Sequence, residues 1–489
     1  MDCTAQSGGL AASLYQPLEE TDVKRVVDEA FRVLEQGGML VHSEAAREAL
    51  AKAGAMVSED TALVRLPRSL VEDAIASNPR SVTLFSRDGR NDCVLEKNRV
   101  YYGTGGTAIH VLDPDTGEQS SSTSEDVALN ARFVDALEHI HLFTINVFPN
   151  EIANTNDIDP NRFFHALDNT TKHVMGGVYS LDGCKKVVRM AEMLAGDGAA
   201  LRDRPFVSFI TLIISPFKID QHYGDMTCYL AEQGLPVVVP TEPICGTTSP
   251  ITLAGNVLTH VAESLGGIAL VQSVRRGAPG IFGSVGSITN LRTMQHVAGG
   301  IERAMINAAV AQCAQYLELP LYSTGGTTDA KEVNVQAAYE TAMSSLLVAM
   351  SGANYIHDIA GLMEEDLTVS YEKLVVDNEI LGMCKRVLRG IEVNDDTLAA
   401  DLLIEKGPGT HYLGDLHTME YLHTEFFMPR LANREPRSQL ADGADALGRA
   451  RQVVREIREK GHPSCVDAKT RAEILAAFPE IRQDFAGVL

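Results

Sequence analysis

Short apolar runs recur through the middle of the chain, and after each run the apolar residues adopt helical spacing. Seven such runs lie at residues 142–148, 173–179, 206–214, 236–240, 280–283, 319–323 and 353–358. Their starts are roughly 30 to 45 residues apart, about the size of one β-strand with its crossover helix. An earlier run, at 99–102 or at 108–112, can supply an eighth strand. Eight such units predict an α/β fold, a closed (β/α)8 TIM barrel over residues 96–370.

An open, doubly wound sheet is the alternative architecture for such a series of strands and helices. That fold commonly carries a glycine-rich nucleotide-binding turn after its first strand. The chain has neither a GxGxxG turn in that position nor a GxxxxGK[ST] motif. The closed barrel is therefore the favoured prediction.

The clearest single unit covers residues 235–265. Its apolar run at 237–239 is β-branched and bounded by prolines, which is typical of a buried parallel strand. Ser249 and Pro250 fit the N-cap and the first position of a helix whose apolar face can pack back onto the strand. Glu242 comes just after the strand, where parallel α/β folds place their reactive groups. A solvated loop carboxylate would fit the same position.

The segments on either side of the barrel have a different pattern. The apolar spacing in residues 1–95 predicts an N-terminal α+β cap. Its helices are expected at 19–37 and 43–53, and further strands and a helix are expected within 61–87. Residues 371–489 predict a C-terminal helical region packed on the barrel. We therefore expect one large barrel domain with an appendage at each end.

The composition narrows the class of protein. With 489 residues and 45% hydrophobic content, the chain can bury a large core. Its formal net charge of −23 argues against nucleic acid or a membrane as a partner and favours a cationic ligand. The eight cysteines are scattered without a CxxC pair, as in reduced intracellular proteins. The N-terminus lacks the features of a signal peptide and no apolar run approaches ~20 residues, so we expect a cytoplasmic protein.

The residues that directly follow the strands should converge on the mouth of a parallel barrel. In this chain they are aromatic, hydroxyl-bearing and acidic, with little lysine or arginine. The candidates for substrate binding are Tyr101, Tyr102, Glu242, Tyr322, Tyr355, His357 and Asp358, with Tyr179 as a further aromatic residue at a strand end. Aromatic rings together with carboxylates attract a quaternary ammonium group. The sequence therefore predicts a cation-binding mouth.

Other catalytic patterns are weaker. His139 and His141 form an HxH pair, but they precede their strand and would lie at the barrel floor, so no bound metal is predicted. Lys331 could act as a Schiff-base lysine, yet a salt-bridging lysine is the better interpretation. No GxSxG elbow indicates a serine hydrolase. The residues alone assign no catalytic group.

Four long stretches carry a family resemblance. They are SRDGR at 86–90, SPITLAGNVLTHVAESLGGIALVQSVRRGAPGIFGS at 249–284, GGIERAMINAAVAQCAQYLELPLYSTGGTTDAK at 299–331 and QAAYETAMSSLLVAMSGANYIHDIAGLMEE at 336–365. Together they resemble the trimethylamine methyltransferase family, the corrinoid-dependent methyltransferases. The resemblance implies a (β/α)8 barrel whose mouth takes a methylated amine. It also implies a partner, a cognate corrinoid protein (cobalamin carrier) whose Co(I) receives the methyl group.

Archaeal trimethylamine enzymes of this family carry pyrrolysine in the mouth, whereas this chain contains only the twenty ordinary residues. The resemblance therefore implies a quaternary amine such as glycine betaine as substrate. A quaternary ammonium releases a neutral amine when Co(I) attacks, so positioning rather than acid–base catalysis would be the main task. The expected cage walls are Tyr101 or Tyr102, Tyr355 and Tyr322, and the expected cation partners are Glu242 and Asp358. His357 is expected to hold the substrate carboxylate or its water.

Two other functions remain open from the sequence, together with the expectation of a homo-oligomer. One is a Schiff-base or metal-dependent lyase on the same barrel. The other is a non-catalytic protein that binds a quaternary amine. The family resemblance favours methyl transfer, which would also explain why no zinc site or proton-transfer pair stands out.

Overall fold

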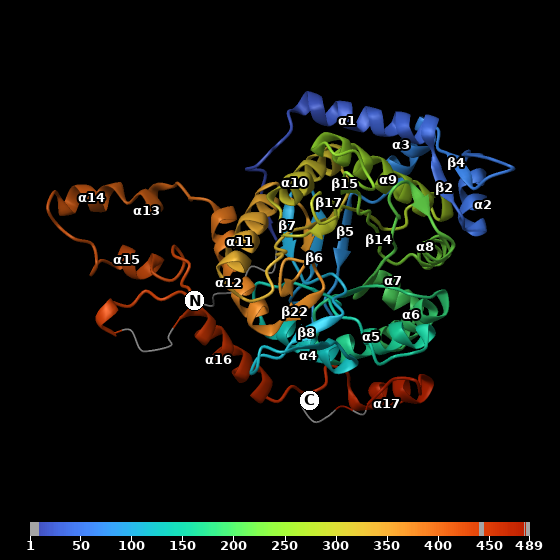
Figure 1. Ribbon diagram of the computed structural model, residues 1–489. Helices are drawn as coiled ribbons and strands as arrows, with labels where there is room; N and C mark the ends of the chain where they lie inside the picture. The colour runs from blue at the N-terminus through green and yellow to red at the C-terminus, as the bar shows by residue number, and fades with distance from the viewer. Residues whose placement is uncertain (1–8, 440–444, 484, 486–489) are drawn as a thin grey trace.

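The computed structural model describes residues 9–439, 445–483 and 485. Its centre is a curled sheet of nine strands in the order β1-β7-β20-β19-β16-β14-β12-β11-β10 (Figure 1). Eight of these strands are parallel: β7 (Arg99–Tyr102), β10 (Phe143–Thr144), β11 (Val174–Gly177), β12 (Val207–Ile210), β14 (Val237–Val239), β16 (Gly280–Gly283), β19 (Leu321–Thr324) and β20 (Tyr355–His357). Each of the seven predicted runs overlaps one of them, and the earlier run at 99–102 supplies the eighth.

The two ends of this parallel series contact each other. Gly103, directly after β7, forms a parallel bridge with Leu142, directly before β10. The backbone N–H of His141 also donates to the carbonyl oxygen of Tyr102 at 2.7 Å. The remaining strand of the sheet, β1 (Leu10–Ala11), pairs antiparallel with β7.

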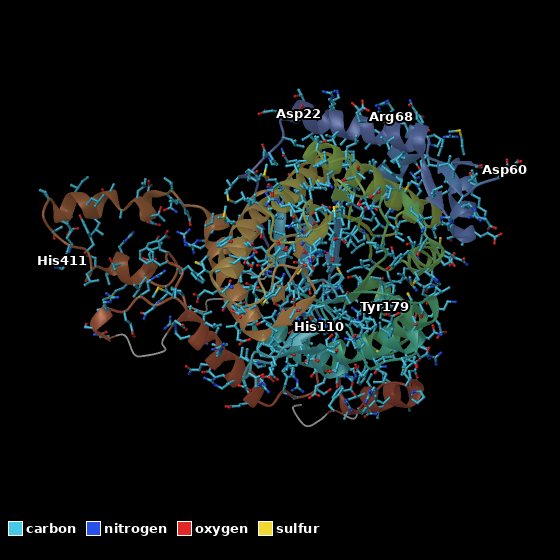
Figure 2. All side chains as sticks on the ribbon, viewed as in Figure 1. Asp22, Asp60, Arg68, His110, Tyr179 and His411 are labelled. Atoms are coloured by element: carbon cyan, nitrogen blue, oxygen red, sulfur yellow. The ribbon has the colours of Figure 1, made fainter. Side chains whose placement is uncertain are left out.

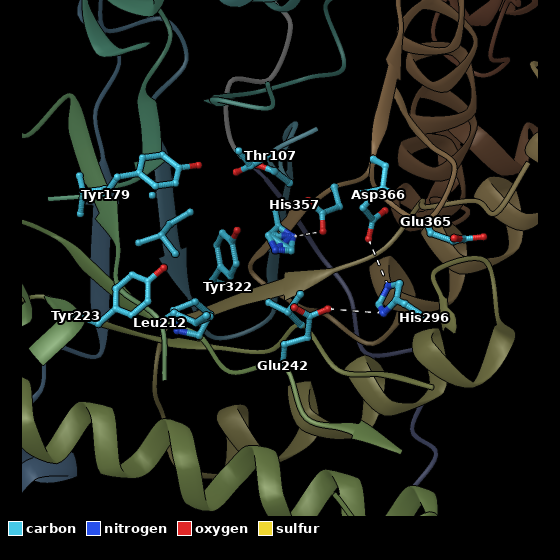
Figure 3. Close-up of a pocket in the computed structure, with 18 of the residues that line it drawn as sticks. Thr107, Tyr179, Leu212, Tyr223, Glu242, His296, Tyr322, His357, Glu365 and Asp366 are labelled. Carbon is cyan, nitrogen blue, oxygen red and sulfur yellow. Dashed lines mark hydrogen bonds and ion pairs between the residues drawn. The ribbon is translucent and has the colours of Figure 1, made fainter. Parts of the chain in front are cut away.

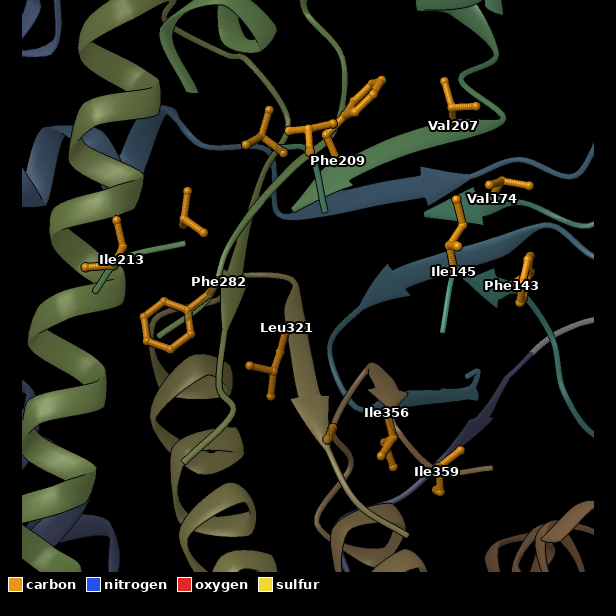
Figure 4. Packing of buried hydrophobic residues seen from close by; sticks show 14 of the residues in the cluster. Phe143, Ile145, Val174, Val207, Phe209, Ile213, Phe282, Leu321, Ile356 and Ile359 are labelled. Atoms are coloured by element: carbon orange, nitrogen blue, oxygen red, sulfur yellow. The ribbon is translucent and has the colours of Figure 1, made fainter. Parts of the chain in front are cut away.

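Helices between the strands cover the outer face of the sheet. They are α4 (Ser124–Ala136), α5 (Thr155–Asn169), α6 (Leu181–Ala195), α7 (Gly198–Asp203), α8 (Gln221–Gln233), α9 (Leu253–Val274), α10 (Ile301–Tyr316), α11 (Val335–Met350) and α12 (Tyr371–Arg389). Figure 4 shows part of the apolar cluster between sheet and helices, including Phe209, Phe282 and Leu321. This cluster is the main core of the protein.

A smaller apolar cluster fills the inside of the curled sheet. In β14, Val238 belongs to this inner cluster while Val237 and Val239 belong to the outer one, as the alternation of a strand requires. The hairpin of β5 (Ser81–Leu84) and β6 (Cys93–Glu96) adds side chains to the inner cluster. Because this inner cluster is apolar, a polar site inside the sheet has to lie beyond it, toward the carboxyl ends of the strands.

Helix α9 is a long and largely buried helix of the outer layer. By length and hydropathy it could cross a membrane, which the sequence analysis did not anticipate, but 83% of its most apolar window is buried inside the protein. It behaves as a core helix. Its predicted start was wrong: Thr252 is the N-cap, accepting from Gly255 N–H, because the hydroxyl of Ser249 accepts a hydrogen bond from Asn256 instead.

The N-terminal segment packs on α9 and contains helices and short strands. Its helices are α1 (Glu20–Arg32), α2 (Glu44–Lys52) and α3 (Arg68–Ser77), and a π-turn covers Val33–Gly37. Its strands β2 (Met39–Val41), β4 (Leu63–Arg65) and β3 (Met56–Val57) form a small sheet with β13 (Lys218–Ile219). This sheet connects the N-terminal segment to the loop after β12.

Two small sheets lie beyond the carboxyl ends of the parallel strands. One contains β15 (Ile244–Cys245), β17 (Ser287–Asn290) and β18 (Gln295–Val297). The other contains β21 (Leu362–Met363), β22 (Thr368–Ser370), β8 (His110–Leu112) and β9 (Gln119–Ser121). They carry the loops that surround the candidate site.

The C-terminal helices fall into two groups. Helix α16 (Ala446–Glu459) packs on α12, and α17 (Ala468–Ala477) lies beside α6. Helices α13 (Asp395–Leu398), α14 (Ala400–Lys406) and α15 (Leu416–Tyr421) project away from the body (Figure 1), and none of their described residues is buried. We call residues 391–428 the arm.

A buried ion pair fastens α12 to the loop after β20. Lys373 and Asp377, both 1% exposed, are 2.7 Å apart, and Asp377 also accepts from the backbone N–H of Gly361. Breaking such a pair from one side leaves an uncompensated charge in the core. We expect Asp377→Asn to lower the free energy of unfolding by about 3 kcal/mol or more in urea denaturation.

The matched control is Glu72→Gln, which breaks an exposed i,i+4 pair with Arg68. Because water already solvates both groups, its effect should stay within about 0.5 kcal/mol. Equal effects of the two substitutions would contradict the assignment of Lys373–Asp377 as a structural pair.

Candidate functional site

A cavity of about 380 Å³ opens at the carboxyl ends of the parallel strands. Figure 3 shows Tyr179 and Tyr223 on one side of it, His296 and Asp366 on the other, and Tyr322, His357 and Glu242 between them. The volume lies within the range of small-molecule pockets, ~300 to 1,000 Å³. The cavity is therefore large enough for a small organic substrate.

One part of the cavity combines rings with a carboxylate. Glu242 follows β14 by three residues, and its side chain is 40% exposed within the cavity. Tyr322, from β19, is 3% exposed and its ring centre lies 3.9 Å from that of His357. A carboxylate with nearby aromatic faces is the arrangement that attracts an organic cation.

The cavity wall also contains a buried arginine. Arg303 lies in the first turn of α10 with its side chain 3% exposed, and it forms ion pairs with Asp366 at 2.9 Å and Asp358 at 3.7 Å. Its Nη1 also donates to the Thr327 hydroxyl at 2.9 Å. Its Nε and Nη2 make no hydrogen bond to any described residue. The guanidinium therefore has unused donors beside the cavity.

The carboxylates around Arg303 respond differently to their surroundings. Burial alone would raise the pKa of Asp366, but Arg303 and His296 outweigh it and hold that pKa below its usual value. Burial, with the neighbouring Asp366 charge, raises the pKa of Asp358 well above its usual value. Burial also raises the pKa of Glu242, opposed by Arg303 and His296. Asp366 thus serves as the anionic partner of Arg303.

His296 lies between the carboxylates of Glu242 and Asp366. Its imidazole nitrogens lie 4.0 Å from the Glu242 carboxylate and 3.8 Å from that of Asp366. It comes from β18, in the small sheet that β15 and β17 complete. His357, by contrast, has its pKa lowered well below the usual value by burial and by Arg303, so its imidazole is neutral.

Asp366 reaches the cavity from a strained turn. Glu364, Glu365 and Asp366 have φ values of 54°, 60° and 70°, in the left-handed region that costs non-glycine residues about 1 kcal/mol or more each. Each side chain is anchored: Glu364 accepts from Gln119 at 2.7 Å, Glu365 pairs with Lys331 at 2.8 Å, and Asp366 pairs with Arg303. These contacts compensate the strain and fix the position of Asp366.

Four of the seven predicted site residues line the cavity: Glu242, Tyr322, His357 and Asp358. Tyr355 lies in the inner cluster, where its hydroxyl is 2.6 Å from that of Thr144. Tyr101 is in the same cluster and accepts from the backbone N–H of Val94. Tyr102 packs in the outer core, fully buried. The structure therefore separates these three tyrosines from the cavity surface.

Sequence reasoning missed Arg303, His296, Asp366 and Tyr223, which also line the cavity. None of them directly follows a parallel strand, so the rule that selected the other candidates could not find them. The acidic run at 364–366 after β20 was the available signal. Lys331, the candidate Schiff-base lysine, is 55% exposed and paired with Glu365, and no lysine of the described chain lines the cavity.

Comparison with known proteins gives consistent matches. The profile of the family described as Trimethylamine methyltransferase (MTTB) matches residues 9–486. Trimethylamine methyltransferase MttB of Desulfitobacterium hafniense (strain DSM 10664 / DCB-2) is 35% identical over 455 residues, which cover 93% of this chain and 91% of that protein. Glycine betaine methyltransferase of Desulfitobacterium hafniense (strain Y51) is 28% identical over 482 residues, covering 96% and 98%.

A solved structure with a similar fold is the crystal structure of the Methanosarcina barkeri monomethylamine methyltransferase (MtmB). The TM-score is 0.51 at 12% sequence identity, and the match covers 95% of this chain and 87% of that one. At this identity the similarity concerns the fold alone.

The opposite pKa shifts of Asp366 and Asp358 predict opposite effects of pH on stability. The depressed pKa of Asp366 contributes stability above its unfolded value of 3.8, and this is lost as the pH falls. The raised pKa of Asp358 makes its ionised form unfavourable, so stability falls as the pH rises above 3.8. We measure urea unfolding of the wild type, Asp366→Asn and Asp358→Asn from about pH 3.5 to about pH 7.

The stability advantage of the wild type over Asp366→Asn should grow from about pH 3.5 to about pH 5 and then stay level, because the unfolded carboxyl is ionised above that pH. The difference between the wild type and Asp358→Asn should move in the other direction. The two variants are matched controls, because both positions have positive φ, which asparagine tolerates. Parallel pH dependences would disprove the assigned charge states.

Proposed function

Because the chain belongs to the trimethylamine methyltransferase family, we propose that it transfers a methyl group from a quaternary amine bearing a carboxylate to a corrinoid protein. The observation that carries this proposal is the composition of one cavity. Its lining includes the Glu242 carboxylate, several aromatic rings, and Arg303 with unused N–H donors. A zwitterion such as glycine betaine has the complementary charges.

The cationic end of the substrate lies against Glu242 and Tyr322 in this proposal. A quaternary ammonium has no N–H group, so it cannot form hydrogen bonds and is held by charge and by ring faces, at about 0.5 to 2 kcal/mol per ring contact. Tyr179 and Tyr223 supply further aromatic surface in the same cavity. Asp358 adds negative charge only where its raised pKa allows ionisation.

The carboxylate end pairs with Arg303. A guanidinium that is 3% exposed and retains unpaired N–H groups favours an anionic partner, because its hydrogen-bonding capacity is otherwise unsatisfied. His357 was the expected carboxylate ligand, and its neutral imidazole, 3.3 Å from Asp358, is a secondary donor in this proposal.

Methyl transfer then needs positioning more than proton transfer. Enzymes of this family act with a corrinoid protein, whose Co(I) supplies the electron pair that forms the new bond to the methyl carbon. The C–N bond breaks and its electrons remain on nitrogen, so the tertiary amine leaves without protonation. The residues of this chain orient the ammonium group and exclude water around it.

We also propose that the curled sheet is a closed (β/α)8 barrel of residues 96–370, between an N-terminal cap of residues 1–95 and a helical region of residues 371–489. The Gly103–Leu142 bridge and the hydrogen bond from His141 to Tyr102 support closure between β7 and β10. Closure would bring the ends of all eight strands around one mouth.

The role of Glu242 is tested with free cob(I)alamin as methyl acceptor, followed by absorbance. We expect Glu242→Gln to lower kcat/KM for glycine betaine by about tenfold, equivalent to ~1.4 kcal/mol. The wild-type value should rise with pH above 4.5, as the Glu242 carboxylate forms, and the variant should lose this rise. Glu318→Gln, beyond the other end of α10, is the control and should leave the rate unchanged. Unaltered turnover in Glu242→Gln would remove Glu242 from the site.

The role of Arg303 is tested by comparing substrates. Choline has a hydroxyl where glycine betaine has a carboxylate, so it lacks the group that Arg303 would bind. We expect the wild type to favour glycine betaine, and Arg303→Met to reduce the ratio of the two kcat/KM values by about tenfold or more. The ratio is insensitive to a uniform loss of folded protein. A ratio that stays constant while both rates fall would assign Arg303 a structural role only.

A further inference from the structure

The arm exposes an unusual amount of apolar surface. Between Ile391 and Met428, eleven large hydrophobic side chains are between 45% and 84% exposed. The most exposed include Ile404, Leu413 and Leu416, at 79%, 82% and 83%. Figure 2 shows side chains of this region, near His411, extending into open space on all sides. Scattered single residues of this kind are common, but a concentration in one segment indicates an interaction site.

The arm has no core of its own. Helices α13, α14 and α15 contain no buried residue among those described. Within the arm, Lys406 pairs with Asp415 at 2.6 Å, and His417 Nε2 lies 3.0 Å from the carbonyl oxygen of Asp396. These contacts hold the two legs of a hairpin together without burying its apolar faces. Helices this short require packing against another surface for stability.

The exposed area matches what a stable association needs. Together the eleven side chains expose on the order of 1,000 Å² of surface. A standard protein–protein interface buries ~800 Å² per partner. The arm alone can therefore supply one side of an interface.

The arm is also distant from the candidate site. Helix α12 begins at Tyr371, four residues after Leu367 of the cavity lining, and ends at Arg389, just before the arm. A helix of 19 residues is about 28 Å long, so the arm starts at the far end of α12. A protein that delivers a methyl acceptor to the cavity would therefore not need to cover the arm.

Charge complementarity indicates what covers the arm. Residues 391–428 contain eight Asp and Glu residues against one lysine, whereas residues 430–460 contain eight Arg and Lys residues against five Asp and Glu. The described ion pairs from the arm to the body reach only Arg386 and Arg389 of α12. No ion pair in the described part of the chain joins the arm to α16. On α16, Arg451 pairs with Glu372 at 3.4 Å but is still 50% exposed. Arg455 is also exposed, so both can face an acidic arm of another copy.

A receiving cleft lies beside that basic helix. It has a volume of about 320 Å³ and is lined by residues 136–139, by α12, by residues at the base of the arm and by Val453 of α16. Val375, Val453 and Phe427 are among its apolar lining residues. Apolar side chains of an arm could enter this cleft while its acidic residues face α16.

We propose that the arm is a dimerisation element, in which residues 391–428 of each copy pack on the α12–α16 face of a second copy. The exchange is reciprocal, so one pair of complementary surfaces forms twice around a two-fold axis. It removes the exposed apolar surface of both arms from water. It also brings each acidic arm to a basic helix.

The test is the mass of the full chain in solution, by sedimentation velocity and light scattering at micromolar concentration. The wild type should have twice the chain mass of 52.9 kDa, and Leu413→Asp/Leu416→Asp should have the mass of one chain. The control, Leu14→Asp/Met56→Asp, replaces side chains that are 63% and 52% exposed elsewhere and should remain a dimer. Circular dichroism and the thermal unfolding of the separated species confirm that each variant is folded.

A monomeric wild type would overturn the proposal, and a different protein would then be the partner that covers the arm. A dimer that persists unchanged in Leu413→Asp/Leu416→Asp would overturn it as well. Because no measurement here uses methyl transfer, the outcome is independent of the proposed function.

Discussion

The buried guanidinium of Arg303 is the constraint on which the arrangement of the cavity depends. A charge with 3% exposure is stable only when nearby groups replace the water that it has lost. Asp366 provides the main compensation, and it does so from a left-handed turn that would be unfavourable in isolation. The interaction therefore fixes a loop, a helix N-terminus and the charge state of the neighbouring carboxylates together. Removing Arg303 would release all three.

The same interaction explains how a cation site can contain an arginine. Asp366 neutralises the guanidinium, and the raised pKa of Asp358 limits further negative charge beside it. Glu242 then remains as a carboxylate at a separate position in the cavity, connected to Asp366 through His296. The site thus contains a carboxylate and a guanidinium rather than charges of one sign. Two opposite charges suit a zwitterion better than a simple amine.

The sequence predicted the frame well and the site in part, for identifiable reasons. Buried strands such as β14 and β16 have a local signature, because both of their faces are apolar. Residue depth has no such signature: Tyr355 and His357 share one face of β20, yet Tyr355 lies in the inner cluster and His357 at the cavity. Depth depends on how neighbouring strands are staggered. Arg303 and Asp366 depend on contacts between distant loops, which no local pattern encodes.

The arm illustrates a second limit of sequence reasoning. Its apolar residues have the spacing of helices that pack on a body, and the composition of residues 371–489 favoured a helical layer. A hydrophobic face specifies that it will be buried, but it contains no information on whether its own chain or another chain buries it. The structure separates the two cases, because α16 buries Ala450 and Val454 whereas α13–α15 bury nothing in the described chain. The opposite charges of the arm and the α16 region then favour burial of the arm by a second copy of the chain. Every copy carries both surfaces, so the arm of each copy can pack on the α16 region of the other.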